Sequence, residues 1–112
     1  MSKDLSISVL MDFYGELLTQ KQRDSLELYY DRDCSLAEIA EDMDISRQGV
    51  RDFIKRGEKQ LYEFEEKLEM VKKYNNISQN ISRLEELIDK IKLDSELKNQ
   101  ATDILEAIKK EL

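Results

Sequence analysis

The sequence predicts an all-α fold. The chain has 112 residues with no proline and only three glycines, so few residues are present that interrupt a helix. Apolar residues recur at steps of three and four along most of the chain, which is the spacing of one face of an α-helix. Together these observations predict one compact helical domain with a helical extension.

Two helices are expected before residue 35. The first carries an apolar stripe of Val9, Leu10, Phe13, Tyr14, Leu17 and Leu18. The second should begin at Thr19, because Thr19 and Gln22 have the spacing of a capping box, in which each side chain bonds a backbone N–H at the helix start. It should continue through Tyr30 and end in the polar run 31–33. We expect both helices to pack beneath the elements that follow.

Residues 35–59 predict a short helix, a tight turn and a second helix. Ser35 and Glu38 form another capping box, so the short helix should begin at Ser35 and end near Asp44 after about two turns. Asp44 tolerates the left-handed conformation that a sharp turn needs, and Ser46 can cap the next helix. This order of elements is typical of the DNA-reading helix-turn-helix.

The second helix of this pair has an apolar and a polar face. Its inward face is predicted to hold Val50, Phe53, Ile54 and Gly57. Ile45 and Val50 have the spacing of a hydrophobic staple, which would hold the angle at which the chain enters the helix. Gly57 costs about 1 kcal/mol relative to alanine inside a helix, so we expect it to mark a close helix crossing.

The outward face of this helix contains the candidate binding residues. In helix-turn-helix docking, the first residues of the second helix contact base edges and later residues contact phosphates. Arginine suits guanine and glutamine suits adenine, so the predicted base-reading residues are Arg47, Gln48 and Arg51. The predicted phosphate-binding residues are Lys55, Arg56 and Lys59.

The charge of the whole chain weighs against DNA binding, whereas its distribution favours it. The chain has 18 basic and 25 acidic residues and a net charge of -7, whereas most nucleic-acid modules are basic. Residues 47–59 nevertheless carry a local net charge of +3, which leaves -10 for the remainder. Charge alone favours the alternative of an ordinary solvated helix face; the turn and staple spacing reverse that preference.

Apolar residues continue the same pattern after the motif. The second helix is therefore expected to run to about Lys73, which is longer than a small domain can cover, so its outer half needs a partner. Asn75 and Asn76 suggest a turn, and Asp94 or Ser95 should cap a last helix. The predicted dimer or packing seam consists of Leu61, Phe64, Leu68, Val71, Ile77, Ile81, Leu84, Ile88 and Ile91. The last helix has its own seam of Leu97, Ala101, Ile104, Ile108 and Leu112.

These seams can bury one another within one chain or across a two-fold axis. We favour a homodimer, since a dimer can also read two DNA half-sites about 34 Å apart. The alternative is a monomer whose terminal hairpin folds back on the long helix. The predicted organisation is a helix-turn-helix domain without a wing at 1–70 and a helical packing or dimerisation extension at 71–112.

No pattern in the sequence indicates catalysis. The chain has no histidine, no pair of cysteines, no glycine-rich phosphate loop and no metal-ligand spacing, so we predict a protein that is not an enzyme and has no cofactor or metal. The longest uncharged run near the start, residues 5–11, is too short for a signal peptide core or a membrane span. We therefore expect a cytoplasmic protein without membrane insertion.

Two stretches of sequence resemble region 4 of bacterial sigma factors. They are LLTQKQRDSLELYY, beginning at Leu17, and SLAEIAEDMDISRQGVRDFIKRGEKQL, beginning at Ser35. The opening VLMDFYGELLT and the pattern SRQ-x-V-x-D-x-IKR-x-EK extend the likeness, and the chain more closely resembles the YlxM family of small helix-turn-helix proteins over most of its first 70 residues. This chain has Asp44 where helix-turn-helix proteins commonly have glycine in the turn.

The resemblance implies a helical fold and a regulatory role in the signal recognition particle pathway, because genes of the family lie beside those for that pathway's GTPases. The expected function is that of a DNA-binding regulatory protein whose partner is DNA and which acts in that pathway. The alternative is a protein or RNA adaptor of the signal recognition particle machinery, in which the helix-turn-helix is a retained scaffold and the acidic remainder meets a basic partner.

Overall fold

The computed structural model describes residues 5–92 and 94–112, which belong to two compact units. The first unit ends at Val71, and the second runs from Lys72 to Leu112. Six α-helices and no strands occur in the described residues, which confirms the predicted all-α class. No helix in this part of the chain is long and apolar enough to span a membrane.

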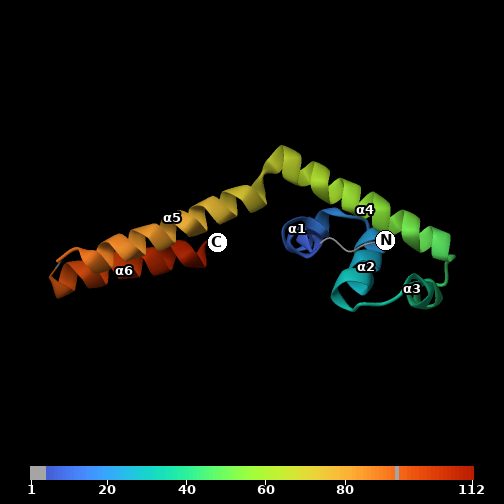
Figure 1. The fold of residues 1–112 in the computed structure, drawn as a ribbon, viewed down its shortest axis with the longest axis horizontal. Coiled ribbons are helices and arrows are strands. Elements are labelled where there is room, and N and C mark those ends of the chain that lie inside the picture. The colour runs from blue at the N-terminus through green and yellow to red at the C-terminus, as the bar shows by residue number, and fades with distance from the viewer. Residues whose placement is uncertain (1–4, 93) are drawn as a thin grey trace. The chain divides into compact units, whose positions relative to one another are not determined.

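One long helix organises the first unit. Its α-helices are α1 (Ser6–Tyr14), α2 (Gln20–Leu26), α3 (Leu36–Met43) and α4 (Arg47–Leu68). A 3-10 turn, Gly15–Leu17, follows α1, and a π-helical turn, Glu27–Asp31, follows α2. The helix α4 packs against α1, α2 and α3, and Figure 1 shows it, in green, lying across all three. Every other helix of the unit is therefore positioned by α4.

Side-chain caps begin the helices where the sequence predicts them. Thr19 and Ser35 each form a complete capping box. Ser46 accepts a hydrogen bond from the third N–H of α4, and Asp94 does the same for the last helix. These local signals depend on residues three positions apart, which is why they can be read from the sequence.

Side chains from all four α-helices form the core of the first unit. The buried members are Ile7, Leu10, Tyr14, Leu18, Leu26, Tyr29, Ile39, Ala40, Val50, Ile54 and Leu61. The predicted stripe of the first helix is partly wrong, because Val9 is 44% and Leu17 59% exposed whereas Ile7 is fully buried. The tighter 3-10 turn after Tyr14 rotates the chain so that Leu18, rather than Leu17, enters the core.

Gly57 marks the predicted close crossing of two helices. A Cβ atom placed on Gly57 would lie only 2.7 Å from Cδ1 of Leu26 in α2. Leu26 is itself fully buried, so it has little room to move. The absence of a side chain at position 57 thus lets α4 approach α2 closely. On the same face, Phe53 is only partly buried.

The helix α4 ends earlier than predicted. It stops at Leu68, and Glu69 adopts a left-handed conformation with φ 53° before α5 (Met70–Lys90) begins. The prediction of one helix running to Lys73 is therefore wrong. The heptad pattern continues across the break, but three of its members have different environments: Leu61 is buried, Phe64 packs at the edge of the core and Leu68 is 45% exposed.

A hydrogen-bond cluster around Tyr14 holds this break. The Tyr14 hydroxyl donates to Glu65 Oε1 at 2.6 Å and accepts from the Met70 N–H at 3.0 Å, while the Val71 N–H donates to the same Glu65 oxygen at 3.0 Å. Burial, and then the hydrogen bond to Glu65, raise the pKa of Tyr14, so its hydroxyl keeps the proton that it donates. The first N–H groups of α5, which have no partner within the helix, are thereby satisfied.

The second unit is a helical hairpin. It contains α5 from Lys72 onward and α6 (Ser95–Lys110), which both figures show side by side in opposite directions. The predicted turn at Asn75 and Asn76 is wrong, because both residues lie inside α5. Asparagine lowers helix stability by less than about 0.7 kcal/mol per residue, and the hairpin turn forms instead before the Asp94 cap.

The Gly57→Ala substitution should destabilise the first unit. Alanine improves helix propensity by about 1 kcal/mol, but the added methyl group must displace buried Leu26, so we expect a net loss of about 1 to 3 kcal/mol in the free energy of unfolding. Urea denaturation followed by circular dichroism measures this change.

Gly15→Ala is the matched control, because its new Cβ would lie 3.5 Å from Met11 Cε, an ordinary contact. We expect that variant to be as stable as the parent or slightly more stable. A Gly57→Ala variant as stable as the Gly15→Ala variant would contradict the close-crossing interpretation.

Candidate nucleic-acid interface

The helices α3 and α4 form the predicted helix-turn-helix. Ser35 Oγ accepts a hydrogen bond from the Glu38 N–H at 3.1 Å, and Glu38 Oε1 accepts one from the Ser35 N–H at 3.1 Å, which determines where α3 starts. Ile39 and Ala40 are buried against the rest of the unit. The small side chain of Ala40 fits the steep approach of α3 to α4 near their shared turn.

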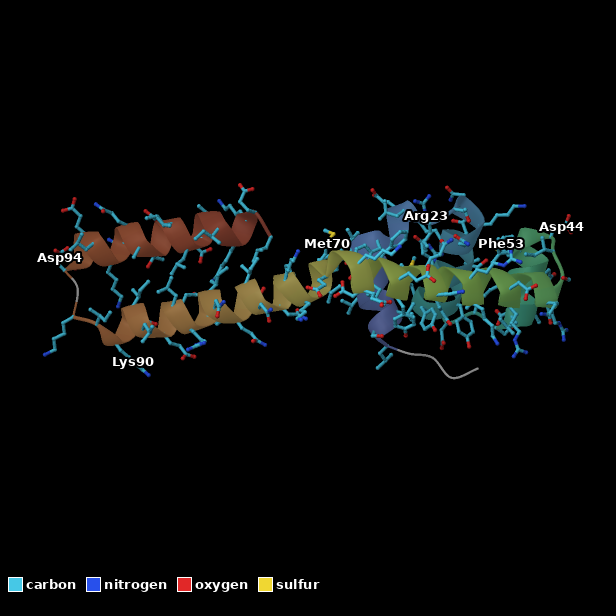
Figure 2. The ribbon with its side chains drawn as sticks, turned by 90° about the horizontal axis from the view of Figure 1, so that it is seen from above. Arg23, Asp44, Phe53, Met70, Lys90 and Asp94 are labelled. Carbon is cyan, nitrogen blue, oxygen red and sulfur yellow. The ribbon has the colours of Figure 1, made fainter. Side chains whose placement is uncertain are left out.

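The turn between these helices is built on Asp44. Asp44 has φ 53° and ψ 46°, the left-handed conformation predicted for it. The Ile45 N–H donates to the Ala40 carbonyl at 3.1 Å, a bond that closes the C-terminus of α3. Figure 2 shows Asp44 at the end of the unit where α4 begins. The carboxylate of Asp44 is exposed, so it adds a negative charge beside the start of α4.

The first turn of α4 is closely packed around its cap. The Gly49 N–H donates to Ser46 Oγ at 3.0 Å. A Cβ atom on Gly49 would lie 3.2 Å from Ser46 Oγ and 3.7 Å from Ile45 Cδ1. Gly49 therefore leaves room for both the cap and the apolar side chain before it. This packing orients the first turn of α4, which carries Arg47 and Gln48.

All six predicted binding residues are exposed on α4. At 3.6 residues per turn, four of the five cations form one row along the helix at steps of four, namely Arg47, Arg51, Lys55 and Lys59. A second row on the helix contains Gln48, Asp52 and Arg56. Arg56 lies about 100° around the helix from Lys55 but only about 60° from Lys59, its neighbour three residues on. The five predicted cations thus form one surface, with four in the row and Arg56 beside its C-terminal end.

The cations of α4 carry no ion pair within the described residues. None of the five has a carboxylate oxygen within 4.0 Å in that part of the chain, whereas Lys98 and Lys109 of the second unit do. Their guanidinium and ammonium groups remain hydrated and available to an anion. A row of unpaired cations about 6 Å apart along the axis matches the requirement for contacts to a polyanion.

The two acidic residues within 47–59 are bonded to neutral groups instead. Asp52 Oδ1 accepts a hydrogen bond from Gln48 Nε2 at 3.0 Å, and Glu58 Oε1 accepts one from the Tyr30 hydroxyl at 2.6 Å. Sequence analysis did not identify either bond. The four-residue spacing of Gln48 and Asp52 could have indicated the first, whereas the second joins residues 28 positions apart and has no local signal.

The bond to Asp52 affects one predicted base reader directly. Gln48 must release Asp52 before its amide can bond both edge atoms of an adenine. Asp52 also places a negative charge beside the cationic row. The exposed surface of α4 therefore consists of a cationic row with Asp52 beside it. The other acid, Glu58, is hydrogen-bonded to Tyr30.

No cluster of three or more potential metal-ligating side chains occurs among the described residues. The arrangement of caps, left-handed turn and exposed second helix instead defines a helix-turn-helix protein.

The chain belongs to the UPF0122 family, described as "Putative helix-turn-helix protein, YlxM / p13 like", whose model matches residues 1–111. It is 47% identical over 97 residues to a UPF0122 protein of Halalkalibacterium halodurans, covering 87% of this chain and 89% of the relative. A UPF0122 protein of Clostridium kluyveri is 46% identical over 94 residues, with 84% and 85% covered. A Bacillus cereus relative is 42% identical over 110 residues, with 98% and 97% covered.

Removing the charge of Asp52 should strengthen binding of a polyanion to α4. Asp52→Asn keeps the size of the side chain and an oxygen that can accept from Gln48, but it removes the negative charge beside the cationic row. We expect DNA affinity to rise roughly five-fold at 0.1 M salt, which corresponds to about 1 kcal/mol of relieved repulsion. Fluorescence anisotropy with a labelled duplex measures the change.

Glu86→Gln is the matched control. Glu86 is exposed on α5, outside the first unit that carries the cationic row. Its removal should change affinity much less. Equal gains from both variants would show that net charge, rather than the row on α4, determines binding.

Proposed function

We propose that the protein is a DNA-binding regulator that inserts the start of α4 into the major groove. In this proposal Arg47, Gln48 and Arg51 contact base edges, and Lys55 and Lys59 contact phosphates. Arg56, which lies beside Lys59 at the end of the row, contacts a further phosphate. The observation that carries the proposal is the row of cations on α4 that have no ion pair within the described residues.

The distribution of charge supports this assignment. Residues 47–59 have a net charge of +3, whereas the rest of the chain has -10. Negative charge on the rest of the first unit repels DNA, which favours approach of this unit to the duplex through the surface of α4. The expected consequences are weak nonspecific affinity and a marked dependence on salt concentration.

Replacing two predicted base readers should abolish sequence preference. We expect Arg47→Ala and Arg51→Ala each to weaken binding to a selected site by roughly 1 to 3 kcal/mol. Selection from a randomised duplex pool at two salt concentrations, followed by anisotropy on the enriched sequence, measures both preference and salt slope. Replacing Lys59 with alanine should instead weaken all sequences about equally and reduce the salt slope by about 1.

Arg83→Ala is the control for loss of a single cation, because Arg83 is exposed on α5, outside the first unit. It should bind the enriched sequence as the parent does. Equal binding by the parent and the Arg47→Ala/Arg51→Ala variant across the pool would contradict the proposal.

A second candidate function is that of a protein adaptor in the signal recognition particle pathway. Its support comes from the opposite charge of another surface. An open cavity of about 400 Å³ in the first unit is bordered by four carboxylates and one cation, Asp12, Glu16, Glu27, Asp31 and Arg23. A basic protein surface would complement this region, which is separate in sequence from the cations of α4.

Binding to purified signal recognition particle GTPase, with and without its RNA, tests the adaptor proposal. We expect Glu16→Gln/Glu27→Gln to weaken binding several-fold and Arg47→Ala/Arg51→Ala to leave it unchanged. Binding that requires the RNA and is lost with the two arginines would instead assign the contact to α4. No binding in either form would exclude this partner.

A further inference from the structure

The hairpin of the second unit has a small core of its own. Unit two contains 41 residues, from Lys72 to Leu112, and no cysteine or histidine. Among its described residues only Ile81 and Leu105 are buried apolar side chains. Domains of about 40 residues without disulfides or metals usually need association to bury enough apolar surface. The hairpin therefore lacks a covering layer.

Large apolar side chains remain exposed along both of its helices. On α5 they are Ile77 at 43%, Leu84 at 47% and Leu87 at 56% exposure, and Ile91, directly after α5, is 54% exposed. On α6 they are Leu97 at 51%, Ile104 at 62% and Ile108 at 41%. Seven such residues in the hairpin form a continuous pattern rather than scattered exposure.

These residues lie on one face of the hairpin, which we call the apolar face. At about 100° per residue, Leu84 and Ile91 lie to one side of buried Ile81, while Glu85 and Asp89 lie to the other. In α6, Ile104 and Ile108 lie to one side of Leu105, while Lys98 and Lys109 lie to the other.

Two ion pairs between α5 and α6 show which sides of the two helices share a face of the hairpin. Lys109 Nζ lies 3.0 Å from Glu85 Oε1, and Lys98 Nζ lies 3.7 Å from Asp89 Oδ1. The polar sides of the two helices therefore share one face of the hairpin. Their apolar sides must then share the opposite face, so that the seven exposed residues form a single surface.

The charge of the hairpin is suited to contact with its own copy. Residues 72–112 contain eight basic and eight acidic side chains, so the whole net charge of -7 belongs to residues 1–71. Two copies thus repel one another through their first units and not through their hairpins.

We propose that the apolar face is covered by the same face of a second copy of this chain, so that two hairpins form a four-helix bundle. The bundle buries Ile77 and Leu84 of α5, Ile91 directly after it, and Ile104 and Ile108 of α6 across a two-fold axis. This inference goes beyond DNA binding and does not depend on it, because it rests only on residues of the second unit.

Sedimentation equilibrium of the full chain tests the proposal. The parent protein at 100 µM should have twice the chain mass of 13.2 kDa. Leu84→Ala/Ile104→Ala should raise the dimer dissociation constant by about a hundred-fold or more, because four interface side chains are truncated in each dimer. Alanine favours helix, so the variant hairpin keeps its helices, and circular dichroism checks this.

Ser82→Ala/Thr102→Ala is the matched control, because both residues lie toward the polar side of their helices. That variant should remain dimeric, and so should Arg47→Ala/Arg51→Ala. Leu84→Ala/Ile104→Ala should keep the parent's affinity for a duplex that holds one binding site. A monomeric parent protein overturns the proposal, and so does a dimer that survives Leu84→Ala/Ile104→Ala or dissociates with the polar-face variant.

Discussion

The close packing of α4 on α2 at Gly57 is the constraint on which the first unit depends. One face of α4 supplies Val50, Ile54 and Leu61 to the core, and the missing side chain at Gly57 lets Leu26 pack closely on α4. The other helices of the first unit pack against this face, and the cations on the opposite face are exposed among the described residues. Packing therefore places little constraint on that face, and a row of cations can lie there.

The helix caps and the turn at Asp44, which depend on nearby residues, are predicted correctly, whereas the end of α4, which depends on a distant contact, is not. The capping residues Thr19, Ser35 and Ser46 act over three positions, and Asp44 takes its conformation within one turn. The break at Glu69 instead requires Tyr14, which bonds Glu65 from 51 positions away. No periodic pattern records such a contact, so the heptad spacing, which continues through position 71, predicts a continuous helix.

The candidate site shows the same division. Helical periodicity correctly predicts that the six binding residues are exposed, since exposure on α4 follows from which residues enter the core. Periodicity also places Arg56 beside the row, three residues before Lys59. It does not predict that Tyr30 bonds Glu58, because that contact requires the π-helical turn to lie beside α4. The position of the Glu58 carboxylate thus depends on a tertiary contact, although its charge does not.

Charge and apolar surface are divided between the two units in a consistent way. The acidic first unit bears the whole net charge and an exposed cationic helix, while the neutral hairpin bears the uncovered apolar face. Self-association through the first unit would bring like charges together, and DNA contact through the hairpin would bring no net attraction. The first unit is therefore suited to contact with DNA, and the hairpin is suited to contact with a second copy of the chain. A neutral hairpin can join two copies through residues other than the cations of α4, so dimer formation and DNA binding place no competing demands on the same residues.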